Sequence, residues 1–101
     1  MTARYSFTPL AELDLDRITA YSVEEWGAAQ AIDYVKALRV RVRWLAERPG
    51  VGKVRPEIGE GVRSFPEKSH LIFYRATGAL VEILRIRHNA EDLTQGWQDL
   101  P

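Results

Sequence analysis

Arginine and histidine side chains recur along one apolar stretch near the end of the chain. Residues 80–88 read LVEILRIRH, so that Arg85, Arg87 and His88 are interleaved with isoleucine and leucine. Such alternation predicts a strand with a row of cations along one side. Guanidinium groups stabilise negative charge, and an imidazole transfers protons near neutral pH. These residues could therefore bind an acidic segment or act on a phosphate ester.

Other kinds of catalytic or metal site have little support. The chain contains no cysteine, and neither of its histidines, His70 and His88, has a carboxylate at a spacing typical of metal ligands. Ser64 and Ser69 lie outside any nucleophile-elbow pattern, and the glycines of residues 50–61 lack the Lys-Ser or Lys-Thr ending of a phosphate loop. We therefore predict no catalytic residue, no metal and no cofactor.

Two further arginines extend the cationic set. Arg63 lies in the segment GVRSFP, and Arg75 ends the apolar segment SHLIFYR. Taken singly, each arginine could pair with a nearby glutamate, which contributes about 0–1 kcal/mol. Taken together with Arg85 and Arg87, they are predicted to form one cationic face that meets an acidic partner. His88 joins this set, or simply ends its strand with a hydrogen bond to backbone.

Large apolar residues outside the strands fall into two groups. Trp97 and Leu100 lie in the otherwise polar residues 89–101, where Trp97 needs a surface that buries it, so both are predicted partner-binding residues. Tyr21 and Trp26 lie near the end of the first predicted helix, and we expect them in the core.

The spacing of apolar residues predicts two helices after a short strand at residues 4–7. Thr8 and Pro9 are typical of a helix start, and Trp26-Gly27 marks its end. A second helix is predicted from Ala28 to Glu47. Residues 39–44 alternate with period two, which is a strand signal, but the helical spacing of the apolar residues continues through them.

Three strands should follow a loop at residues 50–61. Residues 76–79 (ATGA) join two stretches rich in β-branched and aromatic residues, which indicates a β-hairpin. Pro66 and the next two residues are predicted to form the turn before it. The fold class is α+β, in the order β-α-α-β-β-β: a helical hairpin packed on one face of a small, mainly antiparallel sheet. The 101 residues form a single domain, of which 89–101 are a C-terminal tail.

The distribution of charge limits the classes of partner. Residues 12–33 carry six acids and one base, whereas residues 36–48 carry five bases and one acid, and the formal net charge is zero. A nucleic-acid coat protein would be basic overall, so direct sequence-specific nucleic-acid binding is not expected. The two segments can be solvated helix faces or a partner-docking surface. No apolar run is long enough for a signal peptide or a membrane span, so we expect a cytoplasmic protein without a membrane partner.

Three blocks of the sequence resemble those of a known family. The segments WGAAQA, GVRSFPEKSHLIFYR and VEILRIRH, in this order, are similar to the signature blocks of ParE-type toxins. These toxins belong to the RelE/ParE superfamily of bacterial toxin–antitoxin systems. The resemblance spans nearly the whole chain, which makes it more specific than any single motif.

The resemblance implies a toxin that inhibits DNA gyrase through the A subunit of gyrase, by binding rather than by catalysis. A cognate ParD-like antitoxin would neutralise it in a hetero-oligomer. An alternative is a RelE-like ribosome-dependent mRNA endoribonuclease. Such nucleases commonly use arginine or lysine together with a C-terminal tyrosine or histidine, and His88 after Arg85 and Arg87 partly fits this pattern. However, Asn89 stands where that branch commonly has a tyrosine, and Leu71 where it has an arginine. A third possibility is a member that binds antitoxin but poisons nothing.

Overall fold

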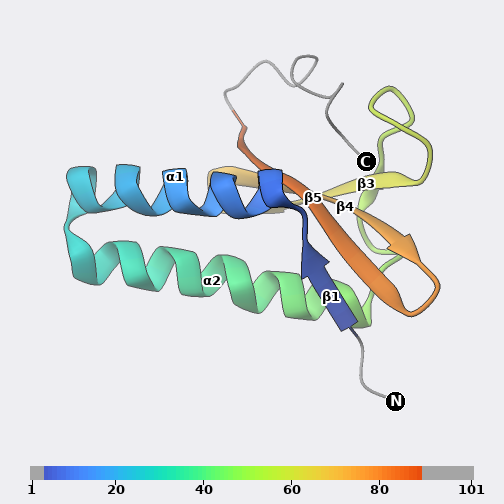
Figure 1. The fold of residues 1–101 in the computed structure, drawn as a ribbon, viewed down its shortest axis with the longest axis horizontal. Helices are drawn as coiled ribbons and strands as arrows, with labels where there is room; N and C mark the ends of the chain where they lie inside the picture. The colour runs from blue at the N-terminus through green and yellow to red at the C-terminus, as the bar shows by residue number, and fades with distance from the viewer. Residues whose placement is uncertain (1–3, 90–101) are drawn as a thin grey trace.

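The structure, a computed structural model that describes residues 4–89, contains two helices packed on one face of a five-stranded sheet (Figure 1). In chain order the elements are β1 (Arg4–Phe7), α1 (Pro9–Trp26), α2 (Ala28–Glu47), β2 (Lys53–Val54), β3 (Val62–Glu67), β4 (His70–Thr77) and β5 (Leu80–His88). The predicted order is confirmed. The two-residue strand β2 is an addition, because it forms inside the segment predicted to be a loop.

Local signals set the ends of both helices. The Thr8 hydroxyl accepts a hydrogen bond from the Ala11 N–H at 3.1 Å, and Pro9 occupies the first turn, where its missing N–H costs nothing. Gly27 ends α1 with φ +89°, a conformation that favours glycine, and α2 begins directly after it. The period-two segment inside α2 is helical, as predicted, because the buried residues Leu38, Val42 and Leu45 keep helical spacing through it, whereas Val40 is exposed.

The strands are arranged in the order β1-β5-β4-β3-β2. Only β1 and β5 are parallel, and the other neighbours are antiparallel, so the sheet is mainly antiparallel as predicted. The turn before β4 begins two residues later than predicted, at Lys68, because β3 continues through Pro66 to Glu67. β2 pairs only with Arg63 and Ser64 of β3. Pro66 lies beyond these two residues, so its missing backbone N–H costs no hydrogen bond to β2.

The main core lies between the helices and the sheet. It contains Ala11, Leu15, Ile18, Tyr34, Leu38, Val42, Leu45, Ala46, Ile72, Tyr74, Val81, Ile83 and Ile86. A second, smaller cluster of Val62, Phe73 and Leu84 lies apart from it, and Ile58 of the loop before β3 packs against this cluster. Strand residues alternate between the two faces of the sheet, so β4 and β5 contribute to both clusters.

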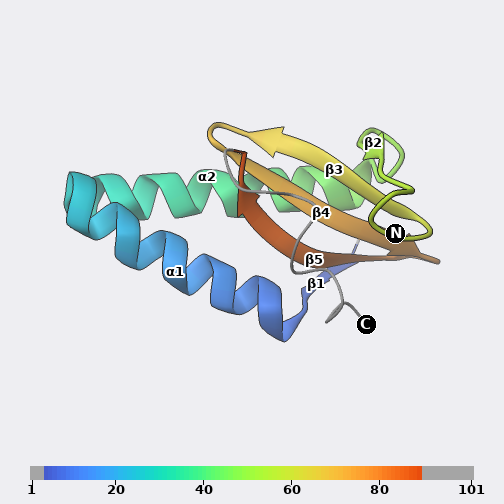
Figure 2. The ribbon, with the colours of Figure 1, turned by 90° about the horizontal axis from the view of Figure 1, so that it is seen from above.

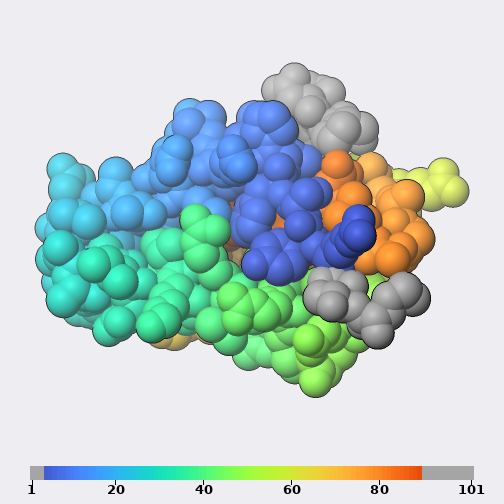
Figure 3. Space-filling view, turned by 60° about the horizontal axis from the view of Figure 1, so that its bottom comes forward, coloured from blue at the N-terminus to red at the C-terminus, as the bar shows by residue number. Residues whose placement is uncertain are grey.

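The helical hairpin is longer than the sheet that it covers. Figures 1 and 2 show the turn between α1 and α2 extending beyond the ends of the strands, and Figure 3 shows the two helices side by side across one face of the molecule. Near this turn, Tyr21 is 57% exposed and Trp26 is 47% exposed. The prediction that these two residues belong to the core is therefore wrong, because solvent reaches about half of each side chain at this end of the hairpin and neither joins a core cluster.

Candidate functional site

Two of the arginines predicted to bind a partner instead donate hydrogen bonds to the backbone of neighbouring loops. The Arg63 guanidinium donates hydrogen bonds to the carbonyl oxygens of Gly52 at 2.9 Å and Gly50 at 3.3 Å. Arg75 donates from Nε to the carbonyl oxygen of Glu60 at 3.1 Å. Both side chains therefore satisfy backbone carbonyl groups of the segment between α2 and β3.

The other two arginines lie on β5. Arg85 pairs with Asp14 of α1, with 2.7 Å between Nε and Oδ2, and its side chain is only 12% exposed. Arg87 is 9% exposed.

The single cationic face that the sequence predicts is not present. Strand register places Arg63 opposite Tyr74, which belongs to the helix-side core, and Arg75 opposite Val62, which belongs to the other cluster. Directly opposite residues share a face, so Arg63 and Arg75 lie on different faces of the sheet. Trp97 and Leu100 lie outside the described residues.

His88 belongs to a cluster that the sequence analysis missed. His70 and His88 are directly opposite on β4 and β5, and their ring centroids are 5.3 Å apart. The Tyr34 hydroxyl lies 2.6 Å from His70 Nδ1 and accepts a hydrogen bond from the Ser69 N–H at 3.3 Å. Because its oxygen already accepts that bond, we assign the hydroxyl as the donor to Nδ1.

The environment of Tyr34 keeps its proton on the hydroxyl. Burial raises the pKa of Tyr34, and the hydrogen bond from Ser69 only partly opposes this rise. The hydroxyl therefore keeps its proton at neutral pH and can donate it to His70 Nδ1.

These residues line a pocket of about 510 Å³, which we call the aromatic–histidine pocket. It is lined by Arg17, Ile18, Tyr21, Ser22, Trp26, Tyr34, Ser69, His70 and His88. The lining comes from the second half of α1, the first half of α2 and the ends of β4 and β5. Because the lining residues come from several elements far apart in the sequence, no short motif predicts this site.

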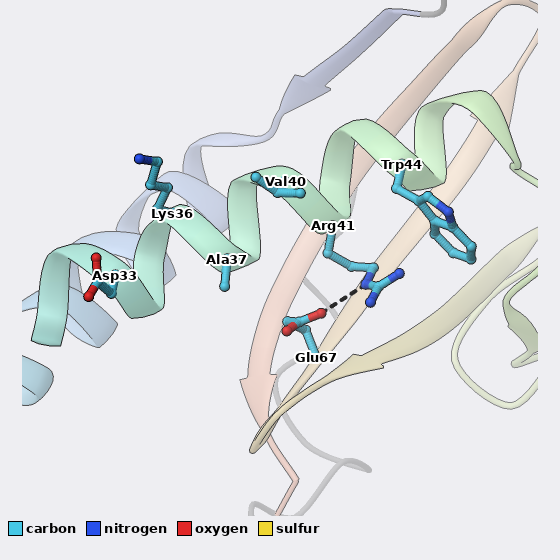
Figure 4. A pocket seen from close by; sticks show the side chains of 7 residues that line it. All are labelled: Asp33, Lys36, Ala37, Val40, Arg41, Trp44 and Glu67. Atoms are coloured by element: carbon cyan, nitrogen blue, oxygen red, sulfur yellow. Dashed lines mark hydrogen bonds and ion pairs between the residues drawn. The ribbon is translucent and has the colours of Figure 1, made fainter.

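A second hollow, which we call the α2 groove, runs along the outer side of α2 and has a volume of about 400 Å³ (Figure 4). It is lined by Asp33, Lys36, Ala37, Val40, Arg41, Trp44 and Glu67. Val40 is 54% exposed, so the groove offers apolar surface together with charges.

Arg41 and Glu67 join the two sides of the α2 groove. Arg41 Nε lies 2.8 Å from Glu67 Oε1, and its guanidinium carbon lies 4.7 Å from the Trp44 ring centroid and 5.2 Å from that of Phe65. A planar guanidinium can stack and pair at once, so this arrangement suits arginine better than lysine. The Arg41 side chain in the groove is therefore held by one ion pair and two aromatic rings.

Four bases are exposed on or directly after α2. Lys36, Arg39 and Arg43 lie on the helix, and Arg48 follows its last residue. Such a surface attracts an acidic segment, and apolar residues between the charges can add contact area.

Among residues 4–89, no group of three or more histidine, cysteine, aspartate or glutamate side chains could hold a metal ion. None of the helices in this part of the chain is long and apolar enough to cross a membrane.

Comparison with known proteins gives consistent results. Residues 5–93 match the family model described as the ParE toxin of the type II toxin–antitoxin system parDE. The chain is 38% identical to Toxin ParE1 of Caulobacter vibrioides over 86 residues, which cover 85% of this chain and 88% of that protein. It is 32% identical to Toxin ParE1 of Mycobacterium tuberculosis over 94 residues, which cover 92% and 96%.

Solved structures agree with these matches. A structure described as the chromosomal ParDE toxin–antitoxin system from P. aeruginosa superposes with a TM-score of 0.75 at 27% identity, covering 86% of this chain and 96% of that chain. A chain of the toxin–antitoxin complex RelBE2 from Mycobacterium tuberculosis superposes with a TM-score of 0.58 at 24% identity. The match covers 88% of this chain and 100% of that chain, and it supports the fold alone. On the strength of the family match and of these relatives, this chain belongs to the ParE toxin family of type II toxin–antitoxin systems.

Proposed function

We propose that this toxin inhibits DNA gyrase by binding, through the gyrase A subunit, and that a ParD-like antitoxin neutralises it. The observation that carries the proposal is the family match over residues 5–93. The similarity to a chain from a ParDE system supports the choice of a ParD-like partner. The toxin and its antitoxin would form a hetero-oligomer.

The α2 groove is the part of the described surface best suited to the antitoxin. An antitoxin segment that carries acids and apolar residues would place its acids near the exposed bases of α2 and an apolar side chain on Val40. The ordering of a disordered segment costs free energy, which a long contact along a helix can offset.

A first experiment tests toxicity and neutralisation. Expression of the chain alone should arrest growth, and co-expression of the ParD-like antitoxin should restore it by forming a stable complex. No toxicity at soluble expression levels, or full protection by an unrelated antitoxin, would count against the proposal.

A second experiment identifies the target. Purified toxin is added in parallel to a gyrase supercoiling reaction and to a translating extract. Inhibition of supercoiling alone is the expected result, whereas inhibition of translation alone would favour the endoribonuclease.

One observation favours the endoribonuclease as a second candidate. The cluster of Tyr34, His70 and His88 brings together side chains that could transfer protons, and Arg17 lines the same pocket. RNA cleavage through these groups would fall about 10²-fold or more in His88→Gln.

Inhibition by binding predicts a different pattern of variants. His88→Gln should remain toxic, because glutamine keeps a polar group of similar reach. Removal of Trp97 and Leu100, which we propose as contacts with a partner, should weaken toxicity more, since a buried tryptophan at an interface can contribute about 2 kcal/mol or more. Antitoxin binding confirms that each variant is folded. If His88→Gln is folded but not toxic, and the variant without Trp97 and Leu100 is fully toxic, the endoribonuclease becomes the favoured function.

A further inference from the structure

We propose that the aromatic–histidine pocket binds a nucleoside 5′-phosphate, either as a free nucleotide or at the end of a nucleic-acid strand. The pocket is separate from the α2 groove, since within residues 4–89 the two hollows share no lining residue. Its volume of about 510 Å³ falls within the usual range for small-molecule sites. This inference does not depend on gyrase inhibition or on antitoxin binding.

One wall of the pocket is a connected set of aromatic rings. The Trp26 ring centroid lies 6.3 Å from that of Tyr21 and 5.9 Å from that of Tyr34, and the Tyr34 ring meets His70 edge-on at 5.5 Å. Tyr21 and Trp26 are about half exposed although they are large and apolar. Nucleobases stack on such rings, at about 1–3 kcal/mol per base.

The polar groups of the pocket suit the edge of a base. Ser69 and the His70–His88 pair line it. Tyr34 fixes the orientation of the His70 ring through the 2.6 Å bond to Nδ1. A few fixed polar groups in an otherwise apolar lining give a pocket its specificity for the orientation of a planar ligand.

The charges of the pocket favour an anion. Arg17 contributes an exposed guanidinium, and none of the described residues that line the pocket is a carboxylate. Lys68 adds a second cation nearby, with Nζ 5.4 Å from the Tyr34 ring centroid. Arginine binds phosphate oxygens through parallel N–H groups, so Arg17 is the residue that we assign to the 5′-phosphate. The combination of stacking rings with a guanidinium separates a nucleotide from a purely apolar ligand.

Calorimetric titration of the full-length toxin tests this inference, with adenosine 5′-monophosphate, adenosine, inorganic phosphate and a 5′-phosphorylated trinucleotide as probes. The monophosphate should bind more tightly than adenosine or inorganic phosphate. Arg17→Gln should weaken the monophosphate by about tenfold or more and leave adenosine nearly unchanged, because it removes only a charge-assisted hydrogen bond. Tyr21→Ala should weaken both, because it removes stacking surface.

Matched controls lie elsewhere on the surface. Arg43→Gln removes an exposed arginine from α2, and Tyr5→Ala removes a partly exposed tyrosine from β1, and neither residue lines the pocket. Both control variants should bind the monophosphate like the unchanged toxin. Thermal unfolding checks that all four variants are folded.

The remaining outcomes decide the source of the ligand or overturn the proposal. Tighter binding of the trinucleotide than of the monophosphate identifies a strand end, and equal binding identifies a free nucleotide. The proposal is overturned if inorganic phosphate binds as well as the monophosphate, or if the folded Arg17 and Tyr21 variants bind it unchanged. It is also overturned if no nucleotide binds, and a loss of antitoxin affinity in these two variants would then assign the pocket to a protein partner.

Discussion

Asp14 and Arg85, which are 71 residues apart in the sequence, form a bidentate ion pair between α1 and β5. Arg85 Nε lies 2.7 Å from Asp14 Oδ2, and Nη2 lies 3.1 Å from Oδ1. The same Oδ2 accepts the backbone N–H of Ile86 at 3.0 Å. One carboxylate of α1 therefore acts as a hydrogen-bonding partner for the edge of β5.

This contact continues the role of β1 along that edge. Pairing between β1 and β5 ends at Phe7 and Ile83. Thr8 then donates from its backbone N–H to the Ile83 carbonyl at 3.0 Å and from its hydroxyl to the Leu84 carbonyl at 2.9 Å. The start of α1 thus satisfies backbone groups that would otherwise be left at a sheet edge.

We predict that Asp14→Ala lowers the free energy of unfolding by about 3–5 kcal/mol. Both side chains are largely buried, at 8% exposure for Asp14 and 12% for Arg85, so the substitution breaks a buried ion pair and also removes the acceptor of the Ile86 N–H. Urea denaturation measures the change.

Asp16→Ala is the matched control for this prediction. Asp16 is an exposed acid two residues further along the same helix, so its removal should change stability by no more than about 0.5 kcal/mol. Equal losses in the two variants would show that the pairing of Asp14 with Arg85 does not stabilise the fold.

Tyr74→Phe should destabilise the protein by about 1–3 kcal/mol. The Tyr74 side chain is fully buried, and its hydroxyl donates to the Pro49 carbonyl at 2.9 Å and accepts the Gly52 N–H at 2.9 Å. Its loss leaves both backbone groups without this partner. Thermal unfolding measures the loss, and hydrogen exchange should show faster exchange at Gly52, whereas unchanged protection there would contradict the assigned role.

Alkaline pH should unfold the protein through its buried tyrosines. Burial raises the pKa of both Tyr34 and Tyr74 above the ordinary value of 10.0. Below pH 10 both states keep these protons, so the stabilisation is fully present. Above pH 10 the unfolded chain releases protons that the folded protein retains, so stability falls as the pH rises towards the raised values.

Denaturation midpoints between pH 9 and pH 12 check this prediction. Tyr74→Phe should flatten the alkaline decline, and Tyr21→Phe should leave it unchanged, because Tyr21 is 57% exposed. A decline of the same steepness in all three proteins would assign it to other groups.

Val40→Asp should weaken antitoxin binding by about tenfold or more without destabilising the toxin. Val40 lines the α2 groove and is 54% exposed, so a carboxylate there would repel an acidic segment and remove apolar contact surface. Calorimetric titration with the antitoxin measures the affinity. Val51→Asp, at a loop residue that is 46% exposed, is the control, and a similar loss of affinity in both variants would argue against the groove.

Hydrogen exchange locates the antitoxin without any substitution. The complex should protect α2 and residues 81–88 of β5 relative to the free toxin. Protection confined to the loop of residues 50–61 would place the antitoxin elsewhere.

The sequence by itself determined the elements other than β2, and their order, because the signals involved act between neighbouring residues. Thr8 and Pro9 start α1, Gly27 separates the helices, and Gly78, with φ +60°, allows the tight turn between β4 and β5. The three signature segments also identified the family. In each case a side chain or a backbone conformation is constrained by residues only a few positions away.

Only the tertiary structure decided which chemistry-bearing residues meet. Counted from the pair Thr77 and Leu80, His88 would lie opposite Ser69, but a bulge between Phe73 and Tyr74 shifts the register and places it opposite His70. A bulge of this kind moves every later pair by one residue, and no local pattern in β4 or β5 announced it. The pairing of Asp14 with Arg85 and the exposure of Trp26 likewise depend on how far the helical hairpin extends across the sheet, which is set by packing between distant segments.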